Sequence, residues 1–203
     1  GMPDIFPVKK YAKKLDIICD NRGIEKTFHR DLVEVDADNK VAIFKDTDSN
    51  ELTSIKYDLL HVTPKMATPD VIKKSLLSKE GGWVDVDDNT MQHNQYDNVF
   101  SCGDCSSLPT SKTTAAIRAQ VPIMVRNILS ARNGLPIVDY YNGYTSCSIV
   151  TGYGRSILAE FDYDLNPRET LPVDQSIERM STYILEKNIM PKLYWHGLLK
   201  GRF

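Results

Sequence analysis

The sequence has few cysteines, no long apolar run and no excess of charge of either sign. Its 203 residues include four cysteines, which is too few for a disulfide scaffold and typical of a reducing compartment. Because 25 Lys and Arg nearly balance 27 Asp and Glu, the chain lacks the basic excess of nucleic-acid-binding proteins, and no nucleic-acid partner is expected. No apolar stretch approaches the ~18 residues that a membrane-spanning helix needs. The first residues also lack the pattern of a signal peptide.

Metal-binding motifs are incomplete. Cys102 and Cys105 form a C-x-x-C pair, but the sequence offers no second ligand pair and no histidines at zinc-finger spacing, so no zinc site is expected. A thioredoxin-like dithiol is disfavoured, because its C-x-x-C must open a helix and Pro109 intervenes before the next helical pattern.

The acidic run Asp85-x-Asp87-x-Asn89 begins like a calcium-binding loop. That loop also needs Gly at its sixth position and Glu at its twelfth, where this chain has Thr90 and Tyr96. The run is therefore interpreted as an exposed acidic turn, and no metal is expected.

No complete phosphate-binding loop is present. Gly152 and Gly154 begin a dinucleotide fingerprint, but Ile157 occupies the place of the third glycine and the following residues favour a strand. The pair is therefore interpreted as a strand bend.

Hydrophobic spacing predicts a helix followed by strands in the first third of the chain. Pro7 suits the first turn of a helix whose apolar positions recur from Val8 to Cys19, and Gly23 suits its end. Polar turns then separate runs that predict strands, at residues 24–29, 32–35, 41–44, 52–57 and 57–62. The last run is mostly apolar, which is typical of a strand buried in a parallel sheet.

The rest of the chain predicts a mixture of helix and strand. Residues 64–98 read as irregular, with one short helix near 71–77. A short strand at 98–101 meets a turn at 102–105, and a long helix begins at Lys112 or Thr113 and ends near Ala131. Pro122 should kink or break that helix. Residues 140–160 predict strands with glycine bends, and the C-terminal residues return to helical spacing.

The turn at Gly103 and Asp104 is the most informative feature. A glycine lets the backbone approach a ligand closely, and an aspartate at the end of a strand offers an acceptor for a hydroxyl group. Lys112 in the first helical turn is unusual, because a cation there opposes the helix dipole. Together with the helix N-terminus it would form a place for an anion. A solvated surface lysine is the alternative interpretation.

Several separated motifs carry a resemblance to a known family. The sequence Val-Phe-Ser-Cys-Gly-Asp at 99–104 is similar to the second flavin-contacting motif of the two-dinucleotide-domain disulfide-reductase superfamily. Six further motifs narrow the resemblance: Pro-Val-Lys-Lys-Tyr-Ala at 7–12, Leu-Leu-His-Val-Thr-Pro at 59–64, Gly-Trp-Val-Asp-Val-Asp at 82–87, Leu-Pro-Thr-Ser-Lys-Thr at 108–113, Tyr-Asn-Gly-Tyr-Thr-Ser-Cys at 141–147 and Leu-Ala-Glu-Phe-Asp-Tyr at 158–163. Together they resemble the mitochondrial-type sulfide:quinone oxidoreductases, from about Phe6 to the end of the chain.

The resemblance implies an α/β flavoprotein fold with two dinucleotide-binding domains, of which this chain would be the C-terminal half only. Residues 1–97 would be the remainder of the second, nicotinamide-type domain, 98–135 the C-terminal part of the FAD-binding domain, and 136–203 a quinone- and membrane-associated domain. Enzymes of this family bind FAD, oxidise hydrogen sulfide at a cysteine pair and pass two electrons to ubiquinone. The sulfur leaves as a persulfide on a small acceptor such as glutathione or sulfite.

The resemblance also assigns expected roles to residues. Cys147 matches one of the two redox cysteines, whereas without the family it reads as a buried, inert side chain. Gly103 and Asp104 would hold the ribityl or phosphate region of FAD, and Lys112 and Thr113 would lie by the pyrimidine edge of the flavin. The other redox cysteine and the G-x-G-x-x-G FAD loop would lie upstream of this chain, so we expect the isolated chain to be inactive.

The C-terminal segment suggests a membrane surface. Its apolar positions alternate with basic ones: Ile189, Met190, Leu193, Tyr194, Trp195, Leu198 and Leu199 with Lys187, Lys192, His196, Lys200 and Arg202. A basic, Trp-bearing amphipathic helix can lie in a lipid interface, although a packed core helix has the same pattern. The resemblance favours the first interpretation and implies a peripheral, monotopic enzyme of the mitochondrial inner membrane.

Two other functions stay open at this stage. One is an NADH:quinone reductase of the same superfamily, which keeps the flavin and changes the electron donor. The other is a non-catalytic α/β interaction module, in which Cys147 is structural and Lys112 is solvated.

Overall fold

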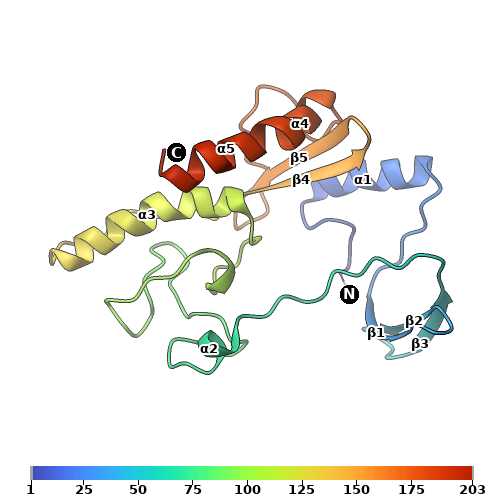
Figure 1. The fold of residues 1–203 in the computed structure, drawn as a ribbon, viewed down its shortest axis with the longest axis horizontal. Helices are drawn as coiled ribbons and strands as arrows, with labels where there is room; N and C mark the ends of the chain where they lie inside the picture. Colours follow the sequence, from blue (N-terminus) through green and yellow to red (C-terminus); the bar gives the residue numbers. More distant parts are fainter. Residues whose placement is uncertain (1, 203) are drawn as a thin grey trace. The chain divides into compact units, whose positions relative to one another are not determined.

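The computed structural model describes residues 2–202, in two compact units that divide between residues 66 and 67. Both units combine helix with antiparallel strands, which Figure 1 shows in blue to teal for the first unit and in green to red for the second. The predicted mixed α/β class is therefore confirmed. The predicted boundaries after residues 97 and 135 stay predictions.

The first unit consists of one helix and a three-stranded antiparallel sheet in the order β1-β2-β3. Its elements are α1 (Lys9–Asn21), β1 (Arg30–Asp36), β2 (Val41–Asp46) and β3 (Leu52–Lys56). Tyr11, Ala12 and Leu15 form the buried face of α1, and Gly23 follows the helix with φ +64°. The predicted helix and its glycine stop are confirmed. Both could be predicted because they depend on local spacing alone.

Two strands predicted for the first unit are wrong. Residues 24–29 and 57–62 belong to no strand, and Leu59 is 90% exposed. Short turns close β1, β2 and β3 into a meander, whereas a parallel strand needs a neighbour reached through a long crossover. Residues 57–62 have no such neighbour within the described unit, so their apolar pattern does not lead to a strand there.

The second unit contains a helical layer and a hairpin. Its elements are α2 (Asp70–Lys73), a 3-10 turn (Gly103–Cys105), α3 (Thr114–Arg132), β4 (Thr145–Gly152), β5 (Arg155–Phe161), α4 (Met180–Ile184), a π-helical segment (Leu185–Ile189), α5 (Met190–His196) and a 3-10 turn (Leu198–Lys200). The hairpin of β4 and β5 packs against the start of α3 and against α4 (Figure 1). The predicted strands, their glycine turn and the C-terminal helices are confirmed.

Two local predictions for this unit are wrong. The strand expected at 98–101 is reduced to a single bridge between Gln92 and Phe100. The break predicted at Pro122 is wrong, because α3 continues through it as one element, whereas the kink given as the alternative stays a prediction. Buried contacts on both sides of the proline, at Gln120 and Asn127, hold the two halves of the helix in place, so the missing backbone hydrogen bond is tolerated.

The irregular residues between α2 and α3 form a small core together with Tyr141, which follows α3. Its buried members are Val84, Val86, Met91, Leu108 and Tyr141. Backbone bonds join its segments: the Val84 N–H donates to the Cys105 carbonyl over 2.9 Å, and the Ser107 N–H donates to the Val84 carbonyl over 2.9 Å. The 103–108 turn is therefore anchored to a packed core.

Gly143, just before β4, lies against an aromatic ring. A Cβ atom there would come within 2.2 Å of the Tyr163 ring, and the residue has φ +82°. The same ring stacks edge-to-face on Tyr141, and its hydroxyl donates to the Asp88 carbonyl over 2.7 Å. The ring cannot move away without losing these contacts, so only glycine fits at position 143.

We predict that Gly143→Ala destabilises the protein by about 3 kcal/mol or more, because it combines a steric clash with a left-handed backbone. Gly134→Ala is the matched control, since Gly134 has φ +66° and a Cβ there meets nothing within 4 Å. The control should cost only the backbone term of about 1–2 kcal/mol. Urea unfolding curves give both values, and equal losses would contradict the packing argument.

Candidate functional site

The candidate redox cysteine lies on β4 at the junction with α3. Residues alternate across a strand, so Thr145 and Cys147 share one face of the hairpin. The Thr145 hydroxyl is 2.9 Å from the Thr113 hydroxyl and donates to the Ser111 carbonyl over 3.4 Å. The Thr113 hydroxyl must therefore donate in the shorter bond. It also accepts from the Ala116 N–H over 3.1 Å as the N-cap of α3.

Burial controls the protonation of Cys147. The half-buried side chain loses solvation, which raises the pKa of the thiol, and a side-chain hydrogen bond with Ser111 lowers it in part. The net direction is upward, so Cys147 holds its proton at Sγ at neutral pH. The site needs a proton acceptor before this sulfur can act as a nucleophile.

The turn at Gly103 and Asp104 packs against α3. The Gly103 N–H donates to the buried Gln120 side-chain oxygen over 2.9 Å. Gly103 has φ +67°, and a Cβ there would lie 3.2 Å from Ile117, so the glycine permits this close approach. The Asp104 side chain beside it is exposed.

Lys112 is neither solvated nor in the first helical turn, so both of those interpretations are wrong. It precedes the N-cap Thr113, and its ammonium donates to the Ser106 carbonyl over 2.6 Å and to the Leu108 carbonyl over 3.1 Å. The ammonium also lies 5.3 Å from the centre of the Trp83 ring. Burial lowers its pKa, and the nearby Asp104 and Cys105 oppose that shift.

The structure thus brings all five candidate residues to the N-terminal end of α3. Ser111 contacts Cys147, Lys112 interacts with Asp104, and Thr113 bonds to the strand that carries Cys147. Sequence reasoning missed three residues that hold this arrangement, namely Trp83, Ser111 and Gln120. Of these three, only Gln120 could have been noticed in the sequence, because it is a polar residue on the packed face of a helical pattern.

The residues present fit part of an FAD-binding site. Asp104 offers an exposed carboxylate that can accept from a ligand hydroxyl. The first N–H groups of α3, at Thr114 and Ala115, have no acceptor inside the helix and can face an anion. The Lys112 ammonium and the Thr113 hydroxyl already bond within the protein, so Lys112 can act on a ligand through its charge.

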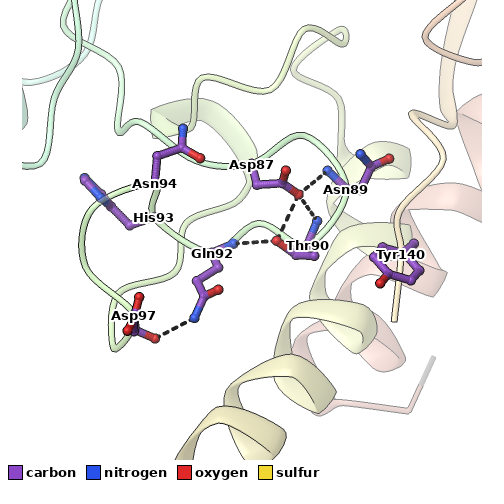
Figure 2. A pocket seen from close by; sticks show the side chains of 8 residues that line it. All are labelled: Asp87, Asn89, Thr90, Gln92, His93, Asn94, Asp97 and Tyr140. Carbon is purple, nitrogen blue, oxygen red and sulfur yellow. Dashed lines mark hydrogen bonds between the residues drawn. The ribbon is translucent and has the colours of Figure 1, made fainter. Parts of the chain in front are cut away.

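A polar depression of about 350 Å³ lies apart from these residues (Figure 2). Eight residues line it: Asp87, Asn89, Thr90, Gln92, His93, Asn94, Asp97 and Tyr140. Figure 2 shows the Asp87 carboxylate turned onto its own loop, where it accepts from the Asn89 N–H over 3.0 Å and the Thr90 N–H over 2.8 Å. This confirms the exposed acidic turn, and the lining includes none of the candidate site residues.

Comparison with solved structures shows where this fold recurs. A chain in the cryo-EM structure of the Tetrahymena thermophila mitochondrial ATP synthase superposes with a TM-score of 0.79 at 22% identity. The match covers 95% of this chain and 47% of the other. At that identity the likeness shows a shared fold alone. No protein-family model matches the chain.

Comparison of sequences finds relatives that are named as mitochondrial oxidoreductases. The relatives are proteins named sulfide:quinone oxidoreductase, mitochondrial: 48% identical over 200 residues in Dictyostelium discoideum, 49% over 199 in Mus musculus and 42% over 210 in Schizosaccharomyces pombe. These matches cover 97–99% of this chain. The resemblance predicted from the separated motifs is therefore confirmed. The chain spans 44–45% of the length of these relatives.

We predict that Lys112→Met destabilises the protein by about 1.5–3 kcal/mol, because two carbonyls lose a charged donor. Lys187→Met is the matched control: Lys187 is exposed and lies 5.6 Å from the Tyr183 ring. That control should change stability by less than about 0.5 kcal/mol. Chemical denaturation measures both, and a Lys112→Met protein as stable as the control would contradict the assigned hydrogen bonds.

A second prediction concerns the pH dependence of Cys147 alkylation. In the folded chain the alkylation rate should keep rising as the pH increases beyond the ordinary thiol pKa of about 8.5. In the urea-unfolded chain it should level off earlier, since the pKa is raised only in the fold. The same shift means that this thiol stops supporting stability as pH rises through the unfolded and then the folded pKa. Mass spectrometry of the peptide 133–155 reports the rates, and coincident pH profiles would contradict the prediction.

Proposed function

We propose that this chain is part of a flavoprotein that oxidises hydrogen sulfide and passes two electrons through FAD to ubiquinone, with Cys147 as one member of the redox cysteine pair. The observation that carries the proposal is the 42–49% identity, over nearly the whole chain, to proteins named for that reaction. The position of Cys147 beside the start of α3, where an anion-binding helix end and Asp104 also lie, supports it.

The proposed fold is that of the two-dinucleotide-domain flavoproteins, with residues 1–97, 98–135 and 136–203 in three different domains. The separated motifs that resemble this family from about Phe6 onward support this assignment. The isolated chain is then expected to bind FAD weakly and to be inactive.

In the proposed site, FAD supplies a two-electron acceptor next to the cysteine pair. Asp104 would accept a hydrogen bond from the ribityl or phosphate region. Gly103 permits the left-handed backbone of the turn that presents Asp104. The hydrogen bond from its N–H to Gln120 holds this turn in place. Lys112 and the first N–H groups of α3, which Thr113 caps, would favour negative charge near the pyrimidine edge of the flavin.

Cys147 would act from its protonated state. Its raised pKa means that the proton leaves Sγ only when a base or a sulfur partner accepts it, and Ser111 orients the thiol meanwhile. A protonated thiol is protected from non-specific oxidation, which suits a residue that must react with one small sulfur substrate. The sulfur would leave as a persulfide on a small acceptor, glutathione or sulfite.

The C-terminal residues supply the proposed contact with the mitochondrial inner membrane. Trp195 is 62% exposed and Leu199 is 55% exposed, and basic side chains at Lys192 and Lys200 flank them. An amphipathic segment of this kind lies in the headgroup region of a bilayer. No helix among residues 2–202 has the length and apolar character to span a membrane.

The test uses this chain joined to the N-terminal part of a curated relative, so that the complete enzyme can bind FAD. Cys147→Ser should lower sulfide-dependent quinone reduction about a hundredfold or more, because the nucleophile is lost. Cys19→Ser is the control, since Cys19 lies on α1 in the other unit, and its activity should match the parent protein.

Three other results of this experiment would contradict the proposal, and each would point to a different conclusion. Full sulfide-dependent activity in the Cys147→Ser protein would defeat the assigned role of Cys147. A flavin bleached by NADH and not by sulfide would identify an NADH:quinone reductase. A joined protein that folds and binds no flavin would identify a non-catalytic module.

A further inference from the structure

The pair Cys102 and Cys105 is the one cysteine motif that the proposed reaction does not use. We propose that these residues form a second sulfur site, a dithiol that takes sulfane sulfur from a low-molecular-weight persulfide and closes to a disulfide. The persulfide is the product class of the proposed function, and the inference rests on that function for its physiological oxidant.

The backbone brings the two residues within reach of each other. Cys102 is the residue before the 3-10 turn and Cys105 is its last residue. One such turn keeps the Cα atoms of residues i and i+3 within about 7 Å, which is the upper limit for a disulfide. The turn is held by the bond from the Gly103 N–H to Gln120 and by the Ser106 hydroxyl, which donates to the Gly103 carbonyl over 2.8 Å. The turn therefore keeps the Cα separation of the two residues within the range that a disulfide can span.

The pair differs from a thioredoxin-like dithiol in its local structure. A thioredoxin-like C-x-x-C opens a helix, and Pro109 separates this pair from α3. The pair instead spans a 3-10 turn of its own, with Cys102 in the N-cap position.

The two sulfurs have different surroundings, which sets their order of reaction. The Cys105 Sγ lies 3.3 Å from the Ser101 hydroxyl and 3.7 Å from the Cys102 carbonyl, so it points back across the turn. It also interacts with the positive charge of Lys112, which can balance negative charge on sulfur during exchange. Cys102 packs against the core cluster, and burial and the neighbouring Cys105 raise the pKa of its thiol. Cys105 is therefore the first acceptor and Cys102 the resolving thiol.

The chemistry balances without another oxidant. The Cys105 thiol reacts with a persulfide R–S–SH to give a persulfide on Cys105 and the thiol R–SH, so the outer sulfur is transferred. The Cys102 sulfur then attacks the inner sulfur of the Cys105 persulfide, forming the Cys102–Cys105 bond and releasing the outer sulfur as hydrogen sulfide with the proton of Cys102. The dithiol is oxidised by two electrons, and the sulfane sulfur is reduced to sulfide.

The test uses the full 203-residue chain and needs no flavin turnover. The reduced chain receives glutathione persulfide under anaerobic conditions, is alkylated and is digested with trypsin. The sequence separates the cysteines conveniently: the peptide 80–112 holds both Cys102 and Cys105, while 15–22 holds Cys19 and 133–155 holds Cys147. We expect the peptide 80–112 to become lighter by two hydrogen atoms and to escape alkylation. Glutathione itself, as the control reagent, should leave it unchanged.

Two conservative variants test the order of the steps. Cys102→Ser should retain one extra sulfur atom on Cys105, and Cys105→Ser should lose the reaction at least tenfold. A peptide 80–112 that stays fully alkylated in the parent chain would overturn the proposal, as would disulfides to Cys19 or Cys147. Because the persulfide is added directly, failure here leaves the sulfide-dependent test of Cys147 unaffected. Success here combined with failure of that test would leave a dithiol site without the proposed enzyme.

Discussion

The Thr113 hydroxyl joins the parts of this protein on which the candidate site depends. It accepts the Ala116 N–H and so begins α3, and it bonds to the Thr145 hydroxyl at the start of β4. One side chain therefore fixes the start of the helix and the position of the hairpin that carries Cys147. Loss of this link would separate the candidate redox sulfur from the helix end and from Lys112.

Burial shifts the pKa values of the thiols and of the lysine of the site in opposite directions. It raises the pKa of Cys147 and of Cys102, and it lowers the pKa of Lys112. All three shifts favour the neutral forms, as expected for groups withdrawn from water. The protein compensates Lys112 with two backbone carbonyls and an aromatic face, whereas Cys147 receives one side-chain hydrogen bond. The lysine is thus held as a fixed positive charge, and the thiol is kept protonated until a substrate reaches it.

Several predictions that rest on local rules were correct. Gly23 ends α1, and the glycine turn between β4 and β5 lies where the sequence indicates. Each of these depends on residues within a few positions along the chain. Two of the errors depend on contacts with distant segments. Residues 57–62 have a strand pattern and no strand neighbour within the described unit, and Pro122 is tolerated because Gln120 and Asn127 are buried beside it.

The sequence by itself determined the mixed α/β class, the family resemblance and the identity of the candidate residues Gly103, Asp104 and Cys147, because motifs and periodicity are properties of neighbouring positions. Only the tertiary structure decided where Lys112 points and what surrounds Cys147. Lys112 turns toward the Ser106 carbonyl and Trp83, and Ser111 reaches Cys147 from another segment. The contacts of Lys112 with Trp83 and of Ser111 with Cys147 join residues far apart in the chain, and their geometry follows from packing around α3.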